Sequence, residues 1–425
     1  MMSPAIKTLI ILAFVAVLFI TEAIPLAITA IGGAIACAFI GVLPMSRIFV
    51  GMANSTIVLF GGMFVVGAAM FHTGLAQSIG EYVVRKAGSS ETALMFGVML
   101  VATVLSSVLS NTGTCACLMP VVLSICAVAK IPASRQLMPL AFACSWGGSI
   151  TLVGTPPNLI VNAALETAGL PKFGFFEFAW IGIPISIAGI IYMVTIGKHL
   201  LPKVELSADQ DIEQEIEATV KDKKKQLISG FTLIIVVIFM ALDFKWMPLH
   251  VAAVIGAMVC VLTGCLTEKQ AYASIDWVTM FLLGMMMAVA EALDKSGAGK
   301  LIADAAVGTM GGDPSPYIVM AVLFLIASVL TQFMSNTAAT ALFAPIGISI
   351  AQSLGASPQA VLMAIAISAA SAYATPVGTP PNTLILGPGG YKFMDYAKPG
   401  IGMIVICFIL SMVLLPIVFP FFPGK

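Results

Sequence analysis

The sequence predicts an all-α polytopic membrane protein with about ten full spans, arranged as two inverted repeats that each contain a re-entrant hairpin and a discontinuous helix. Three observations support this fold class. The 425 residues are 60% hydrophobic and 9% charged, with a mean hydropathy of +1.06, and a soluble domain of that length cannot bury so much apolar surface. Polar motifs that interrupt the apolar segments occur twice at a nearly constant offset. Long stretches around these motifs carry no charged residue.

Composition also limits the partners. The formal net charge is zero, so a nucleic-acid partner has no support, and the expected surroundings are the lipid bilayer of the cell membrane. The eight cysteines lie in apolar stretches and are expected to pack as small hydrophobic residues. Cys115 and Cys117 have no nearby His and predict no metal pair. The first apolar run, 5–20, is followed by Glu22 and Pro25 rather than a small-residue cleavage site, so we expect a retained span.

The most informative pattern is a pair of duplicated motifs. Ser-Asn-Thr at 110–112 is followed by Gly-Thr-Pro-Pro-Asn at 154–158, and the same two motifs recur at 335–337 and 378–382. The offsets are 225 residues for the first motif and 224 for the second. Polar, helix-breaking residues are costly inside an apolar segment. Two such pairs in register indicate an internal duplication in which both halves bring the same polar groups to one site.

The first repeat is predicted at 1–197. Residues 92–129 contain no charge and are slightly too short for two full spans, which need roughly 40 residues plus a turn, so we expect a re-entrant hairpin with Ser-Asn-Thr at its tip. The segment 137–168 should be one broken span, because a Gly followed by two prolines cannot continue a helix. The full spans expected around these elements are 5–21, 24–43, 55–71 and 175–197.

Residues 198–229 form the only long polar stretch, acidic first and then basic, and we expect a solvated cytoplasmic linker there. The second repeat, 230–425, should follow the same order as the first. Its hairpin is expected at 316–353 and its broken span at 360–386. The full spans expected around these two elements are 231–242, 249–266, 277–293 and 400–420.

The distribution of basic residues predicts the topology. With the linker inside the cell, 13 of the 20 Lys and Arg residues lie in inner loops, as the positive-inside rule requires, and both termini lie outside. An odd number of spans per half makes the two repeats inverted. One hairpin then enters from each face, and the two tips meet near the midplane. Inverted repeats with broken helices and a midplane site are typical of secondary transporters.

The tips offer neutral oxygen atoms at membrane depth. Hydroxyl and amide groups lie in both hairpins, and backbone carbonyls are freed at Gly154 and Gly378. Neutral oxygens suit a hard monovalent cation. The second arm of each hairpin begins with free N–H groups, an arrangement that binds anions. Suitable N-cap types at these two helix starts are Asn111 or Thr112 and Asn336 or Thr337.

The paired tips and paired breaks resemble the divalent-anion:sodium symporter family, the INDY-type dicarboxylate transporters, over nearly the whole chain. The resemblance implies a homodimer in which a transport domain slides, like an elevator, against a fixed scaffold. One implied sodium site consists of Ser106, Ser110, Asn111 and Gly154, and the other of Thr331, Ser335, Asn336 and Gly378. The substrate carboxylates would meet Ser110, Asn111 and Thr112 in one half and Ser335, Asn336 and Thr337 in the other, with Thr379 and Pro380 closing the pocket. An extra N-terminal span of the usual family layout is not expected here.

The function expected from this pattern is sodium-coupled symport of a di- or tricarboxylate, of the C4-dicarboxylate type, with sodium as the coupling ion and no resident cofactor. Two alternatives stay open, a sodium-independent dicarboxylate exchanger and a sodium-coupled carrier of a sulfate-type anion. An exchanger of dianions should have a fixed Lys or Arg in its pocket, and neither the hairpins nor the broken spans contain one. An intramembrane enzyme is not expected, because the chain has no G-x-S-x-G or H-E-x-x-H motif and only three His.

Four other residues are weaker candidates. Glu291 and Asp294 end an apolar span, where an ionisable residue suggests function, but a wetted rim is the simpler expectation. His72 also ends a span and is expected to be structural. Trp146, eight residues before the first break, is expected to pack rather than bind a ligand.

Overall fold

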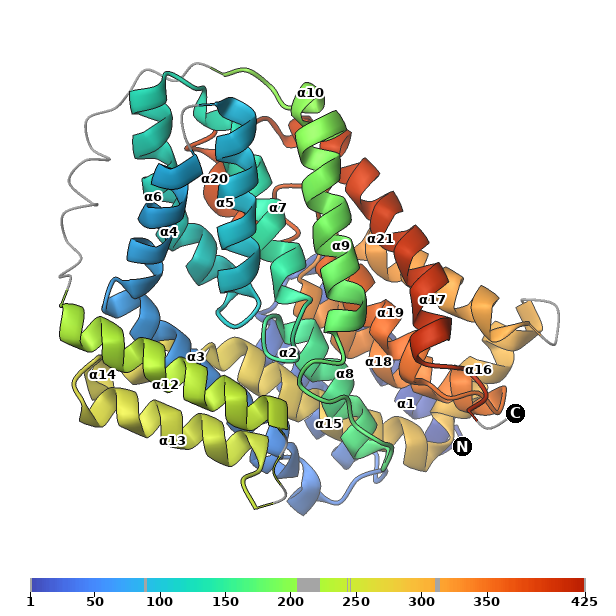
Figure 1. Ribbon diagram of the computed structural model, residues 1–425. Coiled ribbons are helices and arrows are strands. Elements are labelled where there is room, and N and C mark those ends of the chain that lie inside the picture. The colour runs from blue at the N-terminus through green and yellow to red at the C-terminus, as the bar shows by residue number, and fades with distance from the viewer. Residues whose placement is uncertain are drawn as a thin grey trace.

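The fold is all-helical. The computed structural model describes residues 2–87, 90–204, 222–242, 244, 246–309 and 314–423, which form 20 α-helices and no strand (Figure 1). Seven of these helices are long and apolar enough to cross a membrane. Five more apolar helices have 10–17 residues. The predicted all-α polytopic class is confirmed.

The first half contains a helical hairpin followed by a helix pair with an unwound segment between its members. The first hairpin consists of α5 and α6, and the first broken span consists of α7 and α8. The bounds are α1 Pro4–Thr21, α2 Leu26–Phe39, α3 Ser55–His72, α4 Leu75–Ala87, α5 Glu91–Ser106, α6 Asn111–Ala129, α7 Leu137–Gly148, α8 Pro156–Thr167, α9 Ala179–Tyr192 and, after a π-helical turn, α10 Lys198–Leu200.

The helices of the second half repeat this order, and the hairpin and broken-span helices start 222 to 225 residues after their counterparts. The second hairpin consists of α17 and α18, and the second broken span of α19 and α20. The bounds are α12 Lys223–Leu242, α13 Leu249–Leu262, α14 Glu268–Ser274, α15 Trp277–Ser296, α16 Ala298–Thr309, α17 Pro316–Leu330, α18 Asn336–Ser353, α19 Gln359–Ala370, α20 Pro380–Leu386 and α21 Ala397–Val418.

Some helix bounds differ from the expectation. The span expected from 231 begins at Lys223, because the Asp222 carboxylate accepts a hydrogen bond of 2.9 Å from the backbone N–H of Lys224 and starts the helix earlier. Helices α2 and α13 have 14 residues each, fewer than the roughly 20 that cross a bilayer. Most of the expected linker, residues 205–221, lies outside the described residues.

Close helix packing positions the two breaks. In Figure 1, α9 and α21 lie side by side next to the broken spans, while α12 and α13 lie against α3. A Cβ atom added to Gly182 in α9 would lie 2.3 Å from the carbonyl oxygen of Ser149, and one added to Gly400 in α21 would lie 2.3 Å from that of Tyr373. Both glycines therefore allow a helix backbone to approach an unwound segment directly, as buried irregular backbone at membrane depth requires.

Candidate functional site

Each hairpin tip is a serine that caps the second arm. Ser110 has an extended backbone, and its Oγ accepts a hydrogen bond of 3.1 Å from the N–H of Gly113. Ser335 has nearly the same backbone angles, and its Oγ accepts a hydrogen bond of 3.1 Å from the N–H of Ala338. Both arms therefore start as long helices whose first turn faces the tip.

This geometry corrects the predicted caps. Neither Asn111 or Thr112 nor Asn336 or Thr337 is an N-cap, because the serine before each pair takes that place. The serine is the residue with extended backbone, so its oxygen reaches the N–H group three positions along the chain. The asparagine that follows is the first helical residue, and its side chain is turned toward the broken span.

The amide of Asn111 faces a cluster of oxygens in the first half. Its inward end lies 2.7 Å from Ser106 Oγ, 3.0 Å from the carbonyl oxygen of Cys144 and 3.1 Å from that of Gly154. When the nitrogen faces inward, its two N–H groups have three acceptors within reach. When the oxygen faces inward, four neutral oxygens lie together, a grouping that suits a bound cation.

The amide of Asn336 makes the same arrangement in the second half. Its inward end lies 2.8 Å from Thr331 Oγ1, 2.9 Å from the carbonyl oxygen of Ala369 and 3.0 Å from that of Gly378. Thr331 Oγ1 also donates a hydrogen bond to the Ala369 carbonyl. The two clusters therefore match residue by residue, with threonine in place of serine.

The donor set of the clusters fits a hard monovalent cation. It consists of hydroxyl, amide and carbonyl oxygens and carries no formal charge. Within the described part of the chain, no three His, Cys, Asp or Glu residues come together in a way that could hold a metal ion. Divalent cations are held mostly by carboxylates, imidazoles or thiolates, so these neutral clusters do not suit them.

Two asparagines donate hydrogen bonds to backbone carbonyls at the breaks, and no role was predicted for them from the sequence. The Nδ2 of Asn158 donates to the carbonyls of Gly148 at 3.3 Å and Thr151 at 2.8 Å. The Nδ2 of Asn382 donates to the carbonyls of Ala372 at 2.8 Å and Thr375 at 2.9 Å. Both residues end the Gly-Thr-Pro-Pro-Asn motif, so its duplicated asparagine was the available signal. The side chains replace backbone hydrogen bonds that the unwound segments lose.

The glycine of each break leaves no room for a side chain. A Cβ atom on Gly154 would lie 2.4 Å from the carbonyl oxygen of Gly148. One on Gly378 would lie 2.7 Å from the carbonyl oxygen of Thr331. The prolines that follow begin α8 and α20, where the missing N–H removes no helical hydrogen bond.

A cavity of about 410 Å³ lies between the two tips and the two breaks. Thr379, from the second break, is 3% exposed, and its Oγ1 has no hydrogen-bond partner, so it can bind a ligand oxygen. Ser106 and Thr331 are fully buried and do not line the cavity. The predicted site residues that line it are Ser110, Asn111, Thr112, Gly154, Ser335, Asn336, Thr337, Gly378, Thr379 and Pro380.

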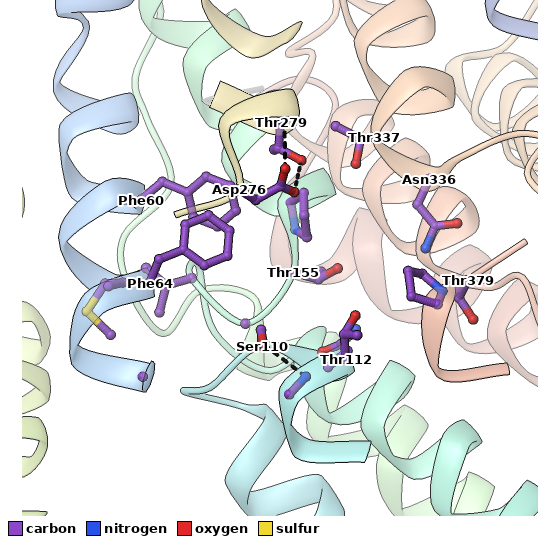
Figure 2. Close-up of a pocket in the computed structure, with 18 of the residues that line it drawn as sticks. Phe60, Phe64, Ser110, Thr112, Thr155, Asp276, Thr279, Asn336, Thr337 and Thr379 are labelled. Atoms are coloured by element: carbon purple, nitrogen blue, oxygen red, sulfur yellow. Dashed lines mark hydrogen bonds between the residues drawn. The ribbon is translucent and has the colours of Figure 1, made fainter. Parts of the chain in front are cut away.

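The opposite wall of the cavity was missed by the sequence analysis. Figure 2 shows Phe60 and Phe64 of α3 across the cavity from Asn336 and Thr379. Asp276 also lines the cavity and caps α15, where its carboxylate accepts hydrogen bonds from the N–H and hydroxyl of Thr279. Its signal was an Asp directly before an apolar run.

The cavity wall carries no fixed positive charge. Among the described residues that line it, Asp276 is the only titratable side chain, and neither Lys, Arg nor His is present. An anion bound there meets only the N–H groups and hydroxyls of the tips. Any further positive charge must come from bound cations.

The weaker candidates lie away from the cavity. Glu291 forms ion pairs with Arg47 at 3.0 Å and Lys295 at 2.6 Å. Trp146 is fully buried, and its Nε1 donates a hydrogen bond of 2.8 Å to Thr103 Oγ1. Asp294 is exposed, and His72 lies 3.5 Å from the Gln270 amide.

Sequence comparison identifies the family. The pattern of the CitMHS family of citrate transporters matches residues 16–355 and 244–423. The chain belongs to this citrate transporter family. Relatives include an uncharacterised Escherichia coli transporter, YfbS, which is 25% identical over 98% of this chain and 99% of its own length. The sodium-dependent dicarboxylate transporter SdcS of Staphylococcus saprophyticus is 24% identical over 91% of this chain and 81% of its own length. These matches confirm the resemblance inferred from the motifs.

Solved structures show a similar fold. The YdaH transporter of Alcanivorax borkumensis has a TM-score of 0.62 and covers 95% of this chain, with 98% of its own chain covered. MtrF of Neisseria gonorrhoeae has a TM-score of 0.65 and covers 100% of this chain, with 97% of its own chain covered. Both are 15% identical to this chain and support the fold alone. The family match and the seven candidate spans identify the protein as a multi-pass transporter of the cell membrane and not an enzyme.

Proposed function

We propose that this transporter carries a di- or tricarboxylate, of the C4-dicarboxylate type, in symport with sodium. One observation supports this proposal most strongly. Two matching clusters of neutral oxygens lie behind a cavity whose described lining has no cationic side chain. Sodium-dependent dicarboxylate transporters among the relatives support the same substrate class and coupling ion.

Charge counting explains the need for cations. A dicarboxylate carries about two negative charges at neutral pH. A helix N-terminus contributes about half a positive charge, so two tips do not balance the substrate, and Asp276 adds a further negative charge to the wall. An uncompensated charge at membrane depth costs several kcal/mol. Sodium ions in both clusters supply the missing charge, and we propose at least two per substrate.

Each tip serves both ligands in this proposal. The cations bind at Asn111 and Asn336 with their neighbouring oxygens, which fixes the amide oxygens inward. The substrate carboxylates then meet the first turns of α6 and α18 and the hydroxyls of Thr112, Thr337 and Thr379. Sodium binding therefore organises the tips before the anion arrives.

We also propose that the hairpins and broken spans move together against a scaffold in a homodimer. The support is that each hairpin is hydrogen-bonded to the broken span of its own half. Ser106 Oγ donates to the Cys144 carbonyl at 2.7 Å, and Thr331 Oγ1 donates to the Ala369 carbonyl at 2.6 Å. Helices α1–α3 and α12–α15 would form most of the scaffold. In the proposed topology both termini are extracytoplasmic and 198–229 is cytoplasmic.

Uptake into proteoliposomes tests the proposal. Labelled succinate, malate, citrate and sulfate are offered with and without an inward sodium gradient. We expect sodium-dependent accumulation of at least one carboxylate. Accumulation of sulfate alone would replace the proposed substrate class. Undiminished carboxylate exchange in sodium-free buffer would replace symport with exchange.

A further inference from the structure

A carboxylate of the chain itself reaches the second hairpin tip. Glu22 lies in the turn between α1 and α2, and its Oε1 accepts a hydrogen bond of 3.2 Å from the backbone N–H of Ser335. Ser335 caps α18 and lines the cavity. Leu26, four residues after Glu22, lines the same cavity. Glu22 is not among the described residues that line the cavity, but its carboxylate bonds to a serine that does, at the tip to which the proposed function brings a substrate carboxylate.

The backbone at Glu22 is unusual for this residue type. Glu22 ends α1 in the left-handed region, with φ 48° and ψ 26°. Among the described residues, seven glycines have positive φ, and the only non-glycine residues that do are Glu22 and Lys130. Glycine adopts this conformation without strain and is the usual residue there. Glu22 therefore carries backbone strain that a glycine would relieve.

A second observation concerns Thr379, from the second break. The Thr379 hydroxyl is buried with no hydrogen-bond partner and lines the same cavity as Ser335. Two carboxylates at one tip would repel each other, because neither Lys nor Arg lines this cavity within the described residues. A substrate carboxylate that binds at Ser335 must therefore displace Glu22.

We infer that Glu22 is an internal competitor of the substrate at the second tip. Its carboxylate accepts from Ser335 until a substrate carboxylate takes its place, and the turn between α1 and α2 then separates from α18. Pro25 corresponds to Pro248 in the second half, so the counterpart of Glu22 is position 245, a lysine in the sequence. The competing carboxylate is not duplicated and acts on one tip. This inference rests on the proposed substrate class.

Substrate affinity measures the competition. The wild type, Glu22→Gln and Glu22→Gly are purified in nanodiscs, and the Kd of succinate, malate and citrate is measured by calorimetry at a fixed, high sodium concentration. We expect a Kd about three- to tenfold lower for Glu22→Gln, which keeps the side-chain shape and removes its charge. Glu22→Gly should bind at least as tightly, and it relieves the backbone strain, so it should also fold.

A matched control separates the carboxylate from the backbone. Lys130→Gly relieves the other left-handed non-glycine residue, which ends α6, and it should leave the Kd unchanged. Equal or weaker binding in both Glu22 variants, beside a wild type that binds, overturns this inference alone. A drop in Kd for Lys130→Gly as large as that for Glu22→Gly, with no drop for Glu22→Gln, also overturns it. A wild type that binds none of the three anions overturns the proposed substrate class and this inference with it.

Discussion

Asn111 and Asn336 are the residues at which the two ligands meet. Each is the first residue of a helix whose N–H groups face the cavity, and each turns its amide toward three oxygens of the neighbouring segments. An amide can present either a donor or an acceptor to those oxygens. The same side chain can thus satisfy the cluster alone or complete a cation site, which links cation binding to the shape of the tip.

The serine caps should couple the two ligands. Ser110→Ala or Ser335→Ala removes the oxygen that holds the first turn of α6 or α18, an interaction of about 1 kcal/mol. We expect sodium and substrate affinities to fall together by about fivefold in each variant. Sodium and substrate titrations of uptake measure both. Ser107→Ala is the control, because its hydroxyl donates only to Val104 of its own helix. A loss of affinity for one ligand only would contradict shared tips.

At the scale of elements, the broken spans depend on side chains for their shape. The unwound segments 149–155 and 371–379 expose backbone carbonyls. Asn158 donates to the carbonyls of Gly148, at the end of α7, and Thr151, and Asn382 donates to those of Ala372 and Thr375. This explains why the motif ends in an asparagine after its prolines. A serine or aspartate could not donate two hydrogen bonds from one side chain in this way.

Removing these asparagines should destabilise the protein strongly. In Asn158→Ala and Asn382→Ala, each carbonyl left without a donor costs about 1–3 kcal/mol. We expect a lower unfolding temperature in detergent and loss of uptake. Ser3→Ala serves as a comparison, because its side chain caps α1 and does not lie in a break. An unfolding temperature equal to that of the wild type would show that the breaks do not need the amides.

The hairpins and breaks are predictable from the sequence, because polar residues interrupt long charge-free runs and this signal is local. Contacts that depend on tertiary packing are not predictable in this way. Glu22 meets Ser335 across 313 positions of the chain, and Phe60 and Asp276 join the cavity from separate helices. The caps were misplaced by one or two residues, because serine, threonine and asparagine are all good N-caps and only the backbone decides between them.

At the scale of the molecule, one contact links a broken span to the proposed scaffold. Glu166, at the end of α8, accepts hydrogen bonds from Asn54 Nδ2 at 3.0 Å and Ser55 Oγ at 3.1 Å at the start of α3. Lys172 lies 3.3 Å from the same carboxylate. An elevator movement of α8 past α3 has to break this contact.

Cross-linking tests this movement. In a cysteine-free background, Asn54→Cys with Glu166→Cys is joined by a short bifunctional thiol reagent with a reducible bond. We expect uptake to stop and to recover on reduction. The matched control is Arg47→Cys with Glu291→Cys, whose native side chains are 3.0 Å apart within the proposed scaffold, and its cross-link should leave uptake intact. Full activity with the first link completely formed would contradict an elevator movement.

Sodium coupling is the central claim for the whole transporter, and the sodium dependence of the initial uptake rate tests it most directly. Proteoliposomes preloaded with unlabelled substrate take up labelled dicarboxylate at a series of external sodium concentrations and constant ionic strength. Because two oxygen clusters must be filled to balance one dianion, we expect a sigmoidal dependence and negligible uptake without sodium. Equally fast uptake in sodium-free buffer would contradict the account.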